Sequence, residues 1–212
     1  MRSRQTNKPD KYIVSECVKV LHDELPYNLH IFVNSVEFIA KVIDTLKLAP
    51  EAVKIVCSTS GESRQENQRK LGKDYPIGQP SDPAKKINFY TSTCFEGCDI
   101  FDPDGVTFIV SDGRKAHTLL DISTLFTQIC GRIRDSRYKA QIVHVYSTTK
   151  YSKAVTLDEF VAATQRTLAD AVNYAAEINS LSDATRVKTL SKIPYINEQY
   201  VRIVNNLSLI HI

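Results

Sequence analysis

The chain has 212 residues, of which 42% are hydrophobic and 24% charged, an ordinary balance for a globular protein. Its formal net charge of +3 permits an anionic partner without requiring one. No run of about 18 apolar residues is present, so we expect neither a membrane-spanning helix nor a membrane partner. The polar start lacks the apolar core of a signal peptide. The five cysteines are interpreted as reduced thiols, which predicts a cytoplasmic protein, encoded by a bacterium or by a phage.

Five short apolar runs predict buried strands, at residues 29–33, 53–57, 87–90, 106–110 and 141–146. Helical patterns are expected over 11–25, from an Asn34-Ser35 cap to about residue 48, over 63–71, and from 122 into the 130s. Residues 1–10 are polar and are expected to be frayed. Residues 72–86 are rich in glycine and proline, which predicts a loop.

Near-continuous apolar strands that alternate with helices predict an α/β fold, with a parallel sheet covered by helices on both faces in three layers. We expect residues 26–148 to form the core of a domain that spans residues 1–150. In such sheets, ligands bind outside the carboxyl ends of the strands. The polar segments that follow the strands are therefore the candidates for a functional site.

The pattern changes after Lys150, and no strand is expected beyond it. Apolar residues from Leu157 to Ile178 follow helical spacing, and a second helical stretch is expected around 183–206. The sequence therefore predicts an α-helical extension over 151–206, with a core too small to fold alone. Residues 207–212 suit a short strand or helix end, but they also match the translation of a transposon end used in sequencing libraries. We interpret them as a non-native tail on a truncated reading frame.

The first candidate segment, Thr91–Ile100, follows the third predicted strand. It begins with three hydroxyl residues, whose side chains and backbone N–H groups suit phosphate oxygens. Gly97 permits a close backbone approach, and Asp99 suits a ribose hydroxyl or a bound water. Taken alone, a polar turn with Asp99 as a helix cap explains this segment better than a site does.

The second candidate segment, Gln128–Arg134, is expected on a helix. Arg132 and Arg134 offer planar guanidinium groups suited to phosphate, and an arginine that reaches a γ-phosphate stabilises transition-state charge. Gln128 is expected one turn before Arg132, on the same helix face. A solvated basic helix end is the alternative. Gly131 is costly inside a helix, which favours a functional reason for the motif.

Together, the two segments resemble motifs V and VI of superfamily 2 helicases and translocases of the DEAD/DEAH-like type. Residues 31–35 resemble motif IV, and residues 58–61 resemble the turn that follows the next strand in that family. The resemblance covers residues 28–148. It implies a RecA-like domain of the P-loop NTPase type, the second of the two such domains in these motors.

The resemblance implies a role for each matching residue. Arg132 and Arg134 would be the catalytic arginines that approach the triphosphate. The residues expected to face the nucleotide are Gly97, Asp99 and Gln128. The residues expected to contact the nucleic-acid backbone are Ser35, Ser60, Gly61 and Thr91. The usual spacing of the family puts the last arginine at position 135, where this chain has Asp135, so the identity of the arginine finger stays open.

Two parts of such a motor are missing from this sequence. It has no phosphate loop, because Leu71–Asp74 resembles that motif only superficially. It also has no Asp-Glu box for Mg²⁺. Both belong to the first RecA-like domain of the family. The resemblance therefore implies ATP with Mg²⁺ as cofactor, in a cleft of which this chain forms one wall. No metal site is expected here, and the chain alone should not hydrolyse ATP.

The resemblance favours a second motor domain of an ATP-dependent helicase or translocase. Its expected partners are a first RecA-like domain in cis and single- or double-stranded nucleic acid, with DNA favoured over RNA. One alternative is a non-catalytic nucleic-acid-binding or assembly module with a degenerate motor fold. Another is the motor part of a restriction or repair complex. A phosphate loop and an Asp-Glu box in an accompanying domain would separate the motor from the binding module.

Overall fold

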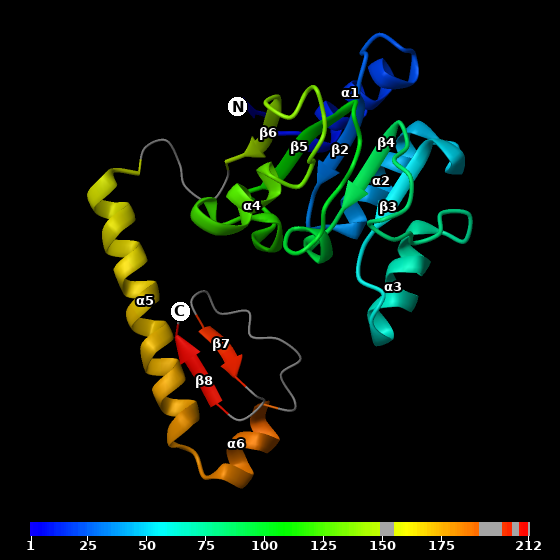
Figure 1. Cartoon of the computed structure of the whole chain (residues 1–212). Helices are drawn as coiled ribbons and strands as arrows, with labels where there is room; N and C mark the ends of the chain where they lie inside the picture. Colours follow the sequence, from blue (N-terminus) through cyan, green and yellow to red (C-terminus); the bar gives the residue numbers. More distant parts are fainter. Residues whose placement is uncertain (149–154, 191–200, 205–207, 212) are drawn as a thin grey trace. The chain divides into compact units, whose positions relative to one another are not determined.

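The computed structural model describes residues 1–148, 155–190, 201–204 and 208–211, which belong to two compact units, 1–150 and 151–212 (Figure 1). The first unit contains a six-stranded sheet with the order β1-β6-β5-β2-β4-β3, in which every neighbouring pair is parallel. The predicted α/β class and parallel sheet are confirmed. The strands are β1 (Arg2–Gln5), β2 (Asn28–Phe32), β3 (Val53–Val56), β4 (Ile87–Tyr90), β5 (Gly105–Asp112) and β6 (Ile142–Ser147).

Helices and short helical turns connect these strands. The longer helices are α1 (Pro9–Leu21), α2 (Val36–Leu46) and α3 (Gly61–Leu71). The short ones are η1 (Pro50–Ala52), η2 (Ser92–Cys94), η3 (Ala116–Thr118), the π-helical η4 (Ile122–Phe126) and α4 (Thr127–Cys130). Helix α2 begins where the Ser35 hydroxyl accepts a hydrogen bond from the Phe38 N–H at 3.2 Å. It ends at Lys47, whose φ of 47° is left-handed.

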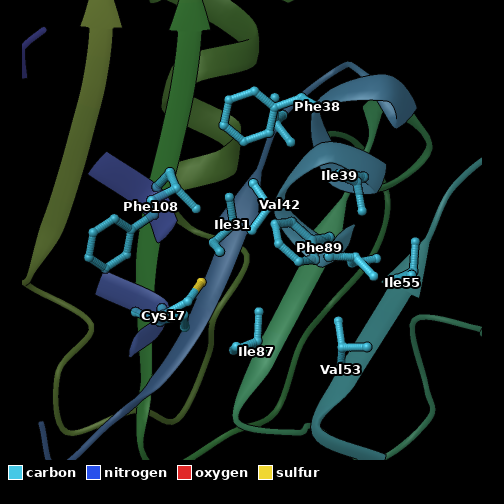
Figure 2. Close-up of a cluster of buried hydrophobic side chains, with 14 of the residues drawn as sticks. Cys17, Ile31, Phe38, Ile39, Val42, Val53, Ile55, Ile87, Phe89 and Phe108 are labelled. Atoms are coloured by element: carbon cyan, nitrogen blue, oxygen red, sulfur yellow. The ribbon is translucent and has the colours of Figure 1, made fainter. Parts of the chain in front are cut away.

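Alternate residues of the central strand β2 supply two separate cores. Ile31 packs with Cys17 of α1 and Val42 of α2 in one cluster, which Figure 2 shows together with Phe89 and Phe108. On the opposite side, Phe32 belongs to a second cluster that includes residues of η4 and α4. Because successive side chains of a strand point to opposite faces, helices cover the sheet on both sides. The result is the three-layer arrangement that the strand pattern predicts.

The predicted core over 26–148 begins too late. The residues that were expected to be frayed form the edge strand β1, which pairs in parallel with β6 and places Arg2 opposite Val143. Helix α1 adds three fully buried side chains, those of Ile13, Cys17 and Val20. All four side chains of β1 are exposed, so its residues carry no apolar pattern; the backbone hydrogen bonds to β6 define the strand.

The second unit contains α5 (Leu157–Ser180) and α6 (Asp183–Leu190), which confirms the helical pattern up to Ile178. A reciprocal cap of Thr156 and Glu159 starts α5. The expectation of helix up to residue 206 is wrong for Val201–Val204, which forms β7 and pairs antiparallel with β8 (Ser208–His211). Partner strands decide such pairings, and a local helical pattern carries no information about them. Residues 191–200 and 205–207 lie outside the described residues.

Gly105 packs against a buried histidine at the start of β5. An added Cβ would lie 2.9 Å from the ring of His30. Hydrogen bonds hold that ring to Asp102 and Tyr90, so it has little freedom to move. We expect Gly105→Ala to lower the free energy of unfolding by about 1–3 kcal/mol, measured by urea denaturation.

Gly131→Ala is the matched control for this prediction. Gly131 has an ordinary φ of −97°, and the nearest atom to an added Cβ is the Gln128 carbonyl oxygen at 3.6 Å. We expect a change within about 0.5 kcal/mol, as for most substitutions away from packed sites. Equal losses in the two variants would contradict the role of the His30 ring.

Candidate functional site

The fold brings the two candidate segments side by side. The Ile100 N–H donates to the Arg132 carbonyl oxygen at 2.9 Å, and the Arg134 N–H donates to the Ile100 carbonyl oxygen at 3.0 Å. These bonds form an isolated parallel bridge between Ile100 and Ile133, whose side chains are both buried in the second core cluster. The ends of Thr91–Ile100 and Gln128–Arg134 are therefore fixed to each other.

Between its buried anchors Phe95 and Ile100, the first segment forms an exposed turn. Gly97 lies in this turn with a φ of 71°, in the left-handed region that favours glycine. No atom lies within 4 Å of the position that a Cβ would occupy. The backbone at Gly97 is thus open to close approach by another group.

The two arginines have different partners. The Arg132 guanidinium donates from Nη1 to the Cys98 carbonyl oxygen at 3.0 Å and from Nε to the Gln128 carbonyl oxygen at 3.2 Å. Arg134 Nε donates to Asp99 Oδ1 at 2.7 Å, and both side chains of this ion pair are about half exposed, 50% and 48%. Among the described residues, Arg132 therefore has no carboxylate partner, whereas Asp99 neutralises Arg134.

The expected helix through Gln128–Arg134 is wrong in its extent. Helix α4 ends at Cys130, and Gly131 is its C-cap, so Arg132 and Arg134 lie beyond the helix. Because Gly131 lies at the end of the helix and not inside it, its presence no longer favours a functional reason for the motif. Gln128 is exposed in the last helical turn, and its carbonyl group, rather than its side chain, binds Arg132.

Asp135, where the usual spacing of the helicase motif would place an arginine, has a structural role. Its Oδ1 accepts a hydrogen bond from the Asp102 N–H at 2.9 Å, which ties the end of the second segment to the loop before β5.

Ser35, Ser60 and Thr91 follow β2, β3 and β4, which are neighbours in the sheet. Ser35 and Thr91 are buried: the Ser35 hydroxyl caps α2, and the Thr91 hydroxyl is hydrogen-bonded to that of Thr93 at 3.0 Å. Ser60 and Gly61 are exposed at the start of α3, where no side chain caps the helix. Of the four predicted backbone contacts, only these two present themselves at the surface.

The sequence analysis missed the role of Asn34. Its Nδ2 donates to the His117 carbonyl oxygen at 2.8 Å, and its Oδ1 accepts from the Ser92 N–H at 3.4 Å. One amide therefore joins the loops that follow β2, β4 and β5. The signal in the sequence was the presence of two polar residues at one strand end, since Ser35 alone is enough to cap α2.

Asp112 lies at the carboxyl end of β5, where it accepts from Arg114 Nε and Nη2, both at 2.9 Å, and from the Ser147 hydroxyl at 2.7 Å. The hydrogen bonds from Arg114 lower the pKa of Asp112 from 3.8 to about 2. A folded pKa below the unfolded value means that the carboxylate stabilises the fold fully above about pH 4, and that this contribution is lost as the pH falls towards 2.

Asp112→Asn is therefore expected to make the free energy of unfolding less dependent on pH between about pH 2 and 4. Urea denaturation at a series of pH values measures this slope. Asp44→Asn, at an exposed position of α2, is the control and should keep the slope of the parent protein. Identical slopes for Asp112→Asn and the parent would rule out this origin of acid sensitivity.

Among residues 1–148, 155–190 and the two short strands, no three His, Cys, Asp or Glu residues are grouped so that they could hold a metal ion. Within the same residues, no helix is long and apolar enough to cross a membrane. Comparisons with protein-family models and with curated proteins find no match to this chain. The site is thus characterised by its own geometry.

Proposed function

We propose that this chain is the second, RecA-like motor domain of a superfamily 2 ATP-dependent helicase or translocase. The observation that carries the proposal is the bridge between Ile100 and Ile133. It holds an open glycine turn and a charged arginine together at one site, although the two segments are separated in sequence by β5. A nucleotide phosphate chain needs such a pair of open backbone and cationic side chain.

Arg132 is the better candidate for the arginine finger. Its acceptors are neutral carbonyl groups, so its charge remains available to a triphosphate, and Asp99 neutralises Arg134 instead. The residues present suit one wall of an ATP site, with Gly97 and Arg132 facing the phosphates. A first domain with a phosphate loop would supply the other wall and the Mg²⁺ ligands, and Mg²⁺ neutralises charge on the transferred phosphoryl group.

The exposed polar groups at the ends of β3 and β4 suit a nucleic-acid backbone. Ser60 and Gly61 present the uncapped N-terminus of α3, where N–H groups favour phosphate. Ser92 and Thr93 are exposed at the end of β4, the strand that neighbours β3 in the sheet. We infer that these four residues make the direct contacts and that the buried Ser35 and Thr91 hold their loops in place.

The first test measures ATP hydrolysis by the chain assembled with a phosphate-loop domain, in one polypeptide or as a mixture. We expect hydrolysis that single-stranded DNA stimulates, with RNA and duplex DNA as comparison substrates. The 212-residue chain alone should show none. An assembled protein that binds DNA without hydrolysing ATP would instead identify a non-catalytic binding module.

The second test measures the binding of fluorescein-labelled single-stranded DNA to the 212-residue chain by anisotropy at several salt concentrations. We expect weak binding that decreases with salt, because phosphate contacts release counterions. Ser60→Asp places a negative charge at the start of α3 and should weaken binding several-fold. Glu96→Gln, in the exposed turn of the other segment, is the control. Equal affinity of the Ser60→Asp variant and the parent for single-stranded DNA would contradict the proposed nucleic-acid contacts.

A further inference from the structure

Two cysteines flank the start of the exposed turn of the first segment: Cys94 precedes it and Cys98 lies within it. Cys94 is fully buried at the end of η2, and Cys98 is partly exposed after Gly97. The Cys98 thiol donates to the Cys94 carbonyl oxygen, with 3.3 Å between sulfur and oxygen. Phe95 is buried between them and packs against Phe32, with 6.3 Å between ring centroids. Packing therefore holds both cysteines in a single tight turn.

The surroundings make the two thiols unequal. A hydrogen bond from the Cys94 thiol, together with the positive charge of Arg132, lowers the pKa of Cys98 to about 7. The same interaction and burial raise the pKa of Cys94. Burial also raises the pKa of Cys17 to about 12 and that of Cys57 to about 11. Near neutral pH, a substantial fraction of Cys98 is thus the nucleophilic thiolate, with the Cys94 thiol beside it.

We propose that Cys94 and Cys98 form a peroxide-responsive dithiol, in which Cys98 is oxidised first and Cys94 closes an intramolecular disulfide. The Cys98 thiolate attacks one oxygen of a hydroperoxide, the O–O bond breaks, and the alkoxide or hydroxide takes up a proton. The Cys94 sulfur, after losing its proton, attacks the Cys98 sulfenic acid, and the hydroxyl group leaves as water. One hydroperoxide is reduced for each disulfide formed.

The turn suits this chemistry in two further respects. Cys98 is partly exposed and therefore accessible to a small peroxide, whereas Cys94 is fully buried, so Cys98 is the thiol that reacts first. The Cys98 carbonyl group also anchors Arg132, so the oxidised residue is in direct contact with the site. The proposal does not depend on the motor function, because its test detects only the sulfur chemistry.

The experiment treats the reduced 212-residue chain with hydrogen peroxide at pH 7 and follows its intact mass and its peptide map. We expect the loss of two hydrogen atoms and a crosslink between Cys94 and Cys98. Without any variant, iodoacetamide should label Cys98 about tenfold faster than Cys130, because the thiolate fraction is larger. Cys130 is a matched comparison, since it is also partly buried but its pKa is raised.

Serine variants separate the two roles. Cys98→Ser should abolish the disulfide, and Cys94→Ser should leave Cys98 to accumulate as sulfenic and sulfinic acid. Cys130→Ser should form the crosslink as the parent does. Labelling of Cys98 no faster than that of Cys130, or a crosslink that joins Cys98 to Cys130, would overturn the proposal.

Discussion

Replacing Arg132 by alanine is expected to lower nucleic-acid-stimulated ATP turnover of the assembled motor by about 10³-fold or more, the usual effect of losing an arginine finger. The reason is electrostatic: among the described residues, the Arg132 guanidinium is hydrogen-bonded only to the carbonyl groups of Gln128 and Cys98, so its charge is available to stabilise charge on the transferred phosphoryl group. Steady-state ATPase assays with saturating single-stranded DNA measure the change in kcat. Binding of DNA should change little, because the inferred contacts lie on other loops.

Arg134→Ala is the matched control. Arg134 is paired with Asp99 at 2.7 Å, so its removal should lower turnover by only about tenfold. Arg132→Lys should recover little, because an ammonium group cannot bind two separate carbonyl groups in the same fixed geometry. A larger loss for Arg134→Ala than for Arg132→Ala would reverse the assignment of the finger. Unchanged turnover in both variants would remove the basis for a motor.

Replacing Asp102 by alanine is expected to lower the free energy of unfolding by about 1–3 kcal/mol, the cost of leaving a buried hydrogen-bond donor without its acceptor. Asp102 Oδ2 accepts from His30 Nε2 at 2.8 Å and from Asn28 Nδ2 at 3.0 Å. Its Oδ1 accepts from the Asp104 N–H at 3.0 Å. The side chain of His30 is fully buried, so its ring nitrogen would lose its only acceptor among the described residues without gaining water.

The pKa values of the pair are consistent with this role. Burial lowers the pKa of His30, so the ring is neutral and its Nε2–H donates to the carboxylate. Burial acts to raise the pKa of Asp102, but hydrogen bonds from His30 and Asn28 lower it overall. The remaining ring nitrogen of His30 then accepts from the Tyr90 hydroxyl at 3.1 Å.

Urea denaturation at pH 7 measures the predicted loss. Asp44→Ala, at an exposed position of helix α2, is the control and should change the free energy of unfolding little. The loss in free energy of unfolding for Asp102→Asn should lie between that of Asp102→Ala and that of the control, since an amide oxygen still accepts one hydrogen bond. A loss for Asp102→Ala no larger than that for Asp44→Ala would mean that the buried network adds nothing to stability.

The sequence predicted the strands of the sheet well because each is a short, nearly continuous apolar run. Residues 87–90 were expected as a strand and form β4 with the same limits, and the other four differ by a residue or two at their ends. Strand β1 was missed because its side chains are all exposed. Strand β7 was missed because its pairing with β8 is not visible in a local helical pattern.

The candidate site was predicted in its parts but not in its arrangement. Thr91–Ile100 and Gln128–Arg134 were selected from residue types alone, and the structure joins them through Ile100 and Ile133. The partners of the arginines could not be predicted, because carbonyl groups such as that of Cys98 carry no signature in a sequence. Asn34 was assigned to a cap for the same reason, since its acceptor is the backbone of a distant loop.

The sequence by itself determined the α/β class, the covered parallel sheet and the choice of the two candidate segments, because burial and residue type are local properties. The tertiary structure decided which groups meet: the pairing of Arg134 with Asp99, the binding of Arg132 to the Cys98 carbonyl group, and the burial of Ser35 and Thr91. Each of these depends on distances between residues far apart in the chain. Hydrogen bonds and ion pairs form only within a few ångströms, and the fold alone sets those distances.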